Sequence, residues 1–69
     1  MRSEDVGAAN REAIRVVLAK AKRALSTREI MAATGLSDKT VQVRRKELVL
    51  AGRVTRVGRA WTLTPAGRK

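Results

Sequence analysis

The chain has 69 residues, a length that allows one hydrophobic core and leaves no room for a second domain. It contains no Cys and no His, which removes disulfides, thiol nucleophiles, the usual zinc ligands and the commonest general base. Its formal net charge is +10, so a polyanion is the expected kind of partner.

The positive charge is concentrated in the second half of the chain. Residues 39–69 carry nine Lys and Arg residues and one Glu, a net charge of +8. Five of the six carboxylates precede Lys39, and most have a basic neighbour within four residues, as is typical of solvated helix surfaces. We therefore expect a protein that is not an enzyme and that holds no cofactor and no metal.

The longest apolar runs, such as Leu48-Val49-Leu50-Ala51, are too short to cross a membrane. A polar stretch follows Met1, which is unlike a signal peptide. These features predict a cytoplasmic protein with no membrane partner.

Residues 1–9 have no periodic apolar face and are expected to form a flexible N-terminal arm, with the folded domain over residues 10–69. Asn10 is a candidate N-cap. Apolar residues then recur at steps of three and four: Ile14, Val17, Leu18 and Ala21. The pattern predicts a helix from Asn10 to about Ala24, followed by Leu25 in a short extended link.

Two further helix starts are encoded by capping residues. Ser26-Thr27-Arg28-Glu29 has the spacing of a capping box, and Gly35 is suited to end the short helix that follows. Ser37 caps a third helix that is expected to run to about Ala51 and to end at Gly52. The connection Thr34-Gly35-Leu36-Ser37 is short enough to make the pair a helix-turn-helix.

After Gly52 the apolar period changes from that of a helix to that of strands. Val54-Thr55-Arg56-Val57 and Ala60-Trp61-Thr62-Leu63 flank Gly58-Arg59, which predicts a β-hairpin. The fold class is therefore mainly α with a small β-hairpin (α+β). The predicted core is Ile14, Val17, Leu18, Ile30, Leu36, Val41, Leu48, Val54, Trp61 and Leu63.

This order of elements resembles the winged helix-turn-helix superfamily, and several motifs resemble those of MarR-like and related prokaryotic regulators. They are Thr27-Arg28-Glu29-Ile30, Thr34-Gly35-Leu36-Ser37, Thr40-Val41, Glu47-Leu48 with Ala51-Gly52, and Leu63-Thr64-Pro65-Ala66-Gly67. The run from Arg44 to Gly52 is also similar to small winged-helix proteins of phages. The resemblance implies a sequence-specific binder of double-stranded DNA, with the recognition helix at about 38–51 in the major groove and the wing at 53–63 on the backbone or in the minor groove.

Two positions depart from the superfamily pattern. Arg45 stands where an apolar residue is usual, so either its stem covers core surface while its head reaches solvent, or the third helix is rotated slightly. Val43 and Leu50 form a second apolar line on the outer face of that helix. We expect this line to extend the core against the first helix or the wing, and a homodimer through Val43 and Leu50 is the alternative.

The resemblance assigns two sets of DNA contacts. The residues expected to read bases are Lys39, Thr40, Gln42, Val43 and Lys46. Thr40 has a competing local use at the helix start. The residues expected to meet the backbone or the minor groove are Arg28, Arg44, Arg56 and Arg59. Trp61, the only aromatic residue, is expected to anchor the wing on the core rather than to stack on a base.

Two alternatives to a small prokaryotic or phage transcriptional regulator remain. One is a binder of duplex RNA, because the near-absence of aromatic residues argues against single strands only. The other is a nucleic-acid-binding or protein-docking module of a phage packaging or replication assembly.

Overall fold

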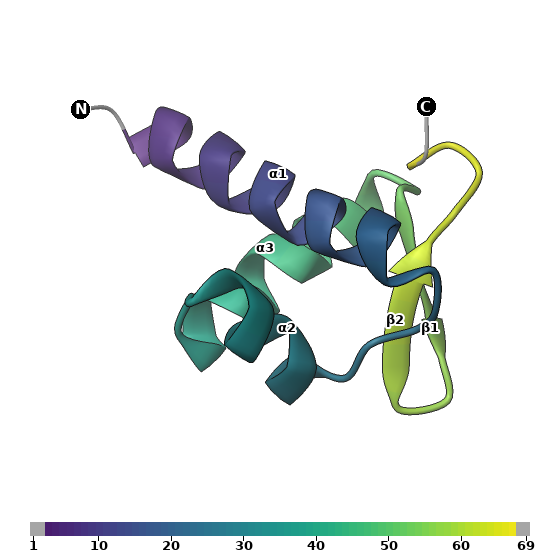
Figure 1. The fold of residues 1–69 in the computed structure, drawn as a ribbon. Helices are drawn as coiled ribbons and strands as arrows, with labels where there is room; N and C mark the ends of the chain where they lie inside the picture. Colours follow the sequence, from purple (N-terminus) through teal and green to yellow (C-terminus); the bar gives the residue numbers. More distant parts are fainter. Residues whose placement is uncertain (1–2, 68–69) are drawn as a thin grey trace.

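The computed structural model describes residues 3–67. Three helices are followed by two strands: α1 (Ser3–Ala21), α2 (Thr27–Thr34), α3 (Asp38–Leu50), β1 (Val54–Val57) and β2 (Ala60–Leu63). The two strands pair antiparallel, and the hairpin packs beside the helices (Figure 1). The mainly α fold with a small β-hairpin is confirmed, and its topology is winged-helix-like.

The predicted starts of α2 and α3 are confirmed. At α2, the Ser26 hydroxyl accepts the Glu29 backbone amide at 3.2 Å, and the Glu29 carboxylate accepts the Ser26 amide at 3.0 Å. At α3, the Ser37 hydroxyl accepts the backbone amide of Thr40. These caps satisfy amides that have no partner within the helix, so they fix both helix starts locally. Between the two helices, Gly35 has φ 74°, the left-handed conformation expected there.

The predicted bounds of the first helix are wrong at both ends. The helix runs through Asn10 from Ser3, so residues 3–9 of the expected arm are helical, while residues 1–2 lie outside the described part of the chain. Packing explains the longer helix: Gly7 is buried, and a Cβ there would lie 2.9 Å from the Arg44 guanidinium. This close approach to α3 stabilises a segment that has no apolar stripe of its own. At the other end the helix stops at Ala21 instead of Ala24, where Lys22 takes φ 56°.

The core lies where the three helices and the base of the hairpin meet. Its buried residues are Ile14, Leu18, Leu25, Ile30, Val41, Leu48, Val54 and Leu63. The predicted residues Val17, Leu36 and Trp61 are partly buried and pack against this cluster. Leu25 was expected only as a link, but it is buried and pairs with β2: its backbone and that of Trp61 exchange two hydrogen bonds of 2.8 Å.

The predicted hairpin and its turn are confirmed. Val54 pairs with Leu63, and Arg56 pairs with Trp61. Successive side chains of a strand point to opposite faces, so these four residues share one face of the hairpin. At the base of that face Val54 and Leu63 are buried in the core. Towards the tip, Arg56 and Trp61 continue the same face beyond the core.

The residues after β2 stabilise the connection between α3 and β1 by hydrogen bonds. The Thr64 hydroxyl donates to the Gly52 carbonyl at 2.6 Å, and the Thr64 amide donates to the Arg53 carbonyl at 3.0 Å. Gly67 is buried, and a Cβ at this position would lie 2.1 Å from the Arg53 carbonyl oxygen. Only glycine allows this approach, so Gly67 helps to fix the direction in which the wing leaves α3.

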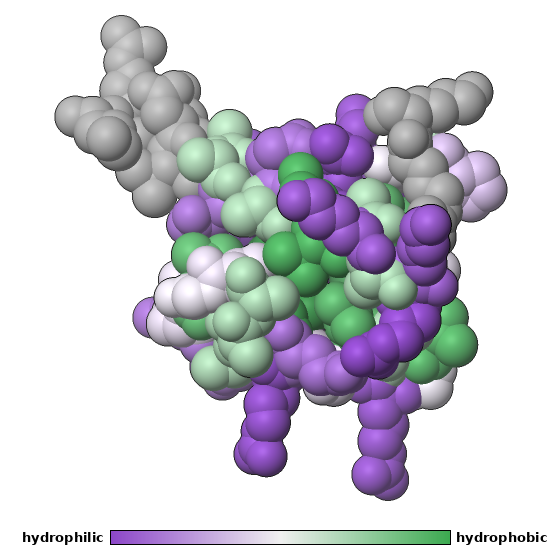
Figure 2. All heavy atoms as spheres, viewed as in Figure 1, coloured by the Kyte–Doolittle hydropathy of each residue, from purple (hydrophilic) through white to green (hydrophobic). Residues whose placement is uncertain are grey.

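The face formed by α1 and α2 has an apolar groove. Figure 2 shows hydrophobic side chains in a hollow between hydrophilic ones. The apolar lining of the groove is Val16, Val17, Ala21, Leu25, Ala32 and Ala33, and its charged lining is Lys20, Arg23 and Glu29. Within residues 3–67, no helix has the length and apolar character needed to cross a membrane.

Candidate nucleic-acid interface

The outer face of α3 is an uninterrupted exposed surface. Lys39, Gln42, Val43 and Lys46 are exposed and recur at steps of three and four, so they lie on one side of the helix. The opposite side carries Val41 and Leu48, which are buried. Core packing therefore fixes the rotation of α3 and leaves four of the five predicted base-reading residues together in solvent.

Two of the predicted base-reading residues, Thr40 and Gln42, form local side-chain hydrogen bonds. The Thr40 hydroxyl accepts from the Ser37 hydroxyl at 2.9 Å, which is the local use expected at a helix start. The Gln42 amide nitrogen donates to the Asp38 carboxylate at 2.8 Å. This bond lies within the exposed first turns of α3, so a stronger partner can replace it.

The expectation that Val43 and Leu50 extend the core is wrong. Val43 is 43% exposed and Leu50 is 78% exposed, and neither belongs to the core cluster or packs on it. The reason is the rotation of α3 set by Val41 and Leu48, which directs both residues away from α1.

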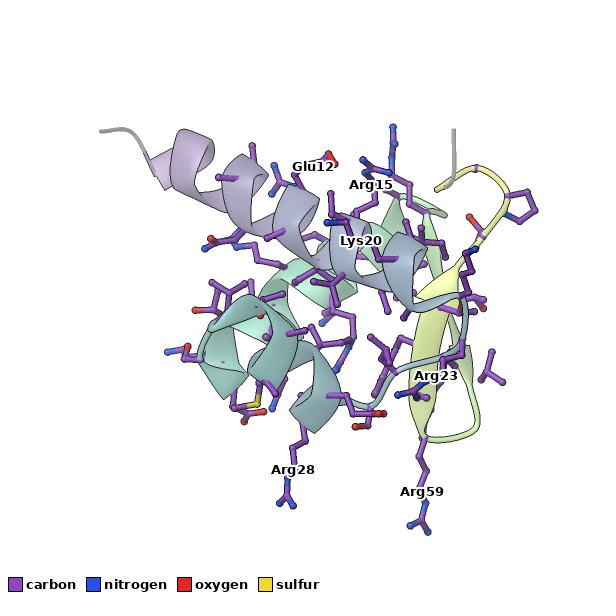
Figure 3. The ribbon with its side chains drawn as sticks, viewed as in Figure 1. Glu12, Arg15, Lys20, Arg23, Arg28 and Arg59 are labelled. Atoms are coloured by element: carbon purple, nitrogen blue, oxygen red, sulfur yellow. The ribbon has the colours of Figure 1, made fainter. Side chains whose placement is uncertain are left out.

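Two of the predicted backbone-contacting arginines extend freely from the same side of the molecule. Arg28 lies in the first turn of α2, and Arg59 lies in the turn between β1 and β2. Both side chains are exposed and point in the same direction, away from the body of the protein (Figure 3). No carboxylate of the described residues lies within 4.0 Å of either one.

Arg44 lies elsewhere, between α1 and α3. Its guanidinium contacts the Glu47 carboxylate at 2.7 Å, and Arg11 of α1 binds the same carboxylate at 3.0 Å. Hydrogen bonds from Arg11 and Arg44 lower the pKa of Glu47. The structure thus gives Arg44 a partner within the fold and does not group it with the other predicted contacts.

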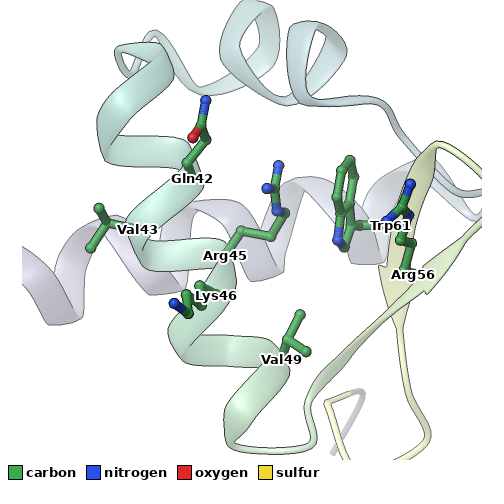
Figure 4. Close-up of a pocket in the computed structure, with 7 residues that line it drawn as sticks. All are labelled: Gln42, Val43, Arg45, Lys46, Val49, Arg56 and Trp61. Atoms are coloured by element: carbon green, nitrogen blue, oxygen red, sulfur yellow. The ribbon is translucent and has the colours of Figure 1, made fainter.

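A groove of about 440 Å³ separates α3 from the hairpin and is lined by Gln42, Val43, Arg45, Lys46, Val49, Arg56 and Trp61. Figure 4 shows the Trp61 ring between the side chains of Arg45 and Arg56. Sequence reasoning gave Trp61 and Arg45 no role in binding. The signal that places Trp61 beside Arg56 is the hairpin register, which a turn at Gly58-Arg59 predicts. The position of Arg45 depends on helix packing and has no such signal.

At Arg45, the expectation that the head of the side chain reaches solvent is wrong. Arg45 is half-buried, its guanidinium Cζ lies 3.6 Å from the Trp61 ring centroid, and its Nη1 donates to the Thr27 hydroxyl at 2.5 Å. The side chain therefore connects α3 with the start of α2 and with the wing. Burial lowers the pKa of Arg45, and nearby Asp38 acts in the opposite direction.

The ion pairs of the described side chains involve no residue on the outer face of α3. They are Arg11–Glu47, Arg15–Glu12, Arg23–Glu29 and Arg44–Glu47, on α1, on the link after it, at the start of α2 and on α3. None involves Arg28, Lys39, Lys46, Arg56 or Arg59. Arg11 and Arg15 of α1 are therefore paired with carboxylates, while Lys39 and Lys46 on the outer face of α3 form no ion pair with the described residues.

No family model matches the chain, and comparisons with curated proteins and with solved structures find no match. The assignment of this protein to a winged-helix-like fold accordingly rests on the order and packing of its own elements.

Proposed function

We propose that the protein binds double-stranded DNA sequence-specifically, with α3 in the major groove and the wing on the adjacent backbone or minor groove. The observation that carries the proposal is the exposed face of α3, which presents Lys39, Gln42, Val43 and Lys46 with no ion pair among the described residues. The proposal gives the chain no catalytic step.

Each side chain on this face has a suitable base-edge partner. The major groove admits one α-helix, and a glutamine amide matches the N6 and N7 atoms of adenine. The lysine ammonium groups match the acceptors of guanine, and the Val43 methyl groups match the methyl of thymine. Gln42 would exchange its bond to Asp38 for a base contact.

The cations around α3 would position the helix without reading sequence. Arg28 lies on α2, before α3 in the chain, and Arg56 and Arg59 lie on the wing, after α3. Contacts from such residues to phosphates release counterions, so binding should weaken steeply with salt. Arg59, at the hairpin tip, is the residue best placed for a narrow minor groove.

Selection of bound sequences from a pool of random duplexes tests the proposal directly. We expect a preferred sequence, and we expect Arg28→Ala to weaken binding of every duplex and to lower the salt slope by about one. Arg15→Ala is the matched control, because that arginine is paired with Glu12 on α1 and should leave binding unchanged. Absence of binding to any duplex DNA at low salt would overturn the proposal.

We propose a role as a small bacterial or phage transcriptional regulator in the cytoplasm, which is the role that the resemblance of its motifs implies. Duplex RNA is the competing polyanion, and the same titration with an RNA duplex separates the two. Tighter binding of RNA than of DNA at equal salt would favour the RNA-binding alternative. Binding of neither would favour a protein-docking module.

A homodimer through Val43 and Leu50 is a second proposal, and it is supported by the exposure of both apolar side chains. In such a dimer the second copy would cover Val43, so Val43 would not contact a base. Sedimentation equilibrium of the wild type and of Leu50→Glu tests it. A dimer that the substitution dissociates would support the contact, and the selected DNA sequence should then be palindromic. A wild type that is monomeric at all concentrations and binds a single half-site would contradict it.

A further inference from the structure

The groove between α3 and the wing contains two arginines on opposite faces of one indole ring. The Cζ of Arg45 lies 3.6 Å from the Trp61 ring centroid, and that of Arg56 lies 5.9 Å from it. Figure 4 shows the ring between the two side chains. Lys46 lines the same groove, so three cationic side chains and the Trp61 ring share it.

Two independent features of the fold place these groups together. The hairpin register sets Arg56 directly across from Trp61, which is why both lie on the face that looks toward α3. The burial of Val41 and Leu48 fixes α3 so that Arg45 crosses the groove to the ring and to Thr27. The arrangement is therefore built into the scaffold.

The two guanidinium groups are not neutralised within the described structure. No carboxylate of residues 7–67 forms an ion pair with either. Asp38 is near enough to act on Arg45, but its carboxylate accepts the amide of Gln42. The like charges of Arg45 and Arg56 disfavour each other, so an anion beside the ring edge that reaches both would relieve a repulsion as well as gain hydrogen bonds.

Donor groups remain available for such an anion. A guanidinium has five N–H donors. Stacking on the ring occupies its flat face and leaves its edge free. Arg45 donates to Thr27, and Arg56 donates through Nε to the Gly58 carbonyl at 2.7 Å. The remaining edges match the geometry of phosphate oxygens, which planar guanidinium groups bind in pairs.

We propose that this groove binds one phosphate group of the DNA backbone, held by the free edges of Arg45 and Arg56 beside the edge of the Trp61 ring, with Lys46 at the rim. The proposal rests on the proposed function for the source of the phosphate. It adds to the proposed function by making Arg45, and Trp61, which packs against the core, part of the binding surface. A phosphate in this position contacts α3 and the wing at once and fixes their relative position.

Trp61 is the only aromatic residue, so its fluorescence, excited at the red edge of its absorption, reports on this groove alone. The first experiment titrates the chain with inorganic phosphate at constant ionic strength, with chloride as the balancing anion. We expect a saturable change in Trp61 emission. An arginine pair that only holds the wing in place would give no saturable response, and that result would overturn the proposal.

Two matched variants remove one positive charge each. Arg56→Gln should weaken the phosphate response about tenfold or more, because it removes a charged hydrogen-bond donor from the groove. Lys20→Gln removes one positive charge from the exposed surface of α1, outside the groove, and should leave the response unchanged. Both positions are exposed, so the fold is expected to survive either change. Equal responses of the two variants would contradict a site in the groove.

A second titration with duplex DNA separates this proposal from the proposed function. Binding is measured by the anisotropy of a labelled duplex, and Trp61 emission is followed in parallel. A duplex that binds without altering the Trp61 response to phosphate would leave DNA binding intact and overturn the groove assignment. A saturable response to phosphate without duplex binding would leave the anion site and overturn DNA as its source.

Discussion

The inner and outer faces of α3 carry similar types of residue, which differ in burial and in ion pairing. On the inner face, Val41 and Leu48 are buried, and Arg44 shares the Glu47 carboxylate with Arg11. On the outer face, Val43 is exposed and the lysines form no ion pair within the described chain. The comparison shows that one helix both closes the core and presents an exposed surface with two lysines that form no ion pair with the described residues.

The largest effect should come from truncating the inner face. Leu48→Ala removes a side chain that is 5% exposed and should lower the free energy of unfolding by about 2–5 kcal/mol. Leu50→Ala makes the same change two residues later, where the side chain is 78% exposed, and should cost about 0.5 kcal/mol or less. Urea denaturation measures both. A large loss for Leu50→Ala would place that residue in a buried interface between copies.

The outer face should respond in binding and not in stability. Gln42→Ala should weaken binding of the selected duplex by about 1–3 kcal/mol and relax the choice at one base pair, with little change on a random duplex. Its melting temperature should stay near that of the wild type, because the side chain is exposed. Equal losses on both duplexes would show that α3 does not read bases, and the recognition-helix assignment would then be wrong.

Acid should act on the carboxylates that form the ion pairs of α1, α2 and α3. A hydrogen bond from Arg23, with the capping bond from the Ser26 amide, lowers the pKa of Glu29 from 4.5 to about 2. Because the folded state depresses this pKa, the stabilisation is complete above about pH 5 and is lost as the pH falls towards 2. The pKa values of Glu12 and Glu47 are lowered in the same way, by hydrogen bonds from Arg15 and from Arg11 with Arg44.

Thermal melting at pH 7 and pH 3 measures this dependence. Glu29→Gln keeps a capping acceptor but does not titrate, so it should reduce the difference in melting temperature between the two pH values. The effect should be modest, since the pairs are at the surface and are screened by solvent and salt. An unchanged pH dependence in Glu29→Gln would mean that its carboxylate is not coupled to folding.

Local signals in the sequence predicted the parts of the fold that local contacts determine. The capping residues Ser26 and Ser37 fixed two helix starts, and the change of apolar period located the hairpin. The start of α1 was not predictable in this way, because residues 3–9 are held by the approach of Gly7 to Arg44, a contact between distant parts of the chain.

The residues of the candidate site likewise divide into those that local sequence signals predict and those whose position depends on contacts between distant parts of the chain. The exposed face of α3 followed from helical periodicity once Val41 and Leu48 were assigned to the core. The stack of Arg45, Trp61 and Arg56 required the rotation of α3 and the hairpin register together, and only the second of these has a local signal. Arg44 was assigned to the DNA backbone because its charge was visible in the sequence and its partners Glu47 and Arg11 were not.

The smallest expected effect concerns the end of α1, which the sequence placed three residues too late. Lys22 has φ 56°, a left-handed conformation that disfavours residues with a Cβ and that glycine adopts readily. Lys22→Gly should therefore raise the free energy of unfolding by about 0.5–1 kcal/mol. Lys20→Gly is the matched control, because Lys20 lies in the last turn of the helix and glycine there should cost about 0.5–1 kcal/mol. Each variant loses one lysine from an exposed position, so the loss of charge is the same and only the backbone conformation differs. Urea denaturation should give changes of opposite sign, whereas a loss of stability in both variants would mean that α1 continues past Ala21 in solution.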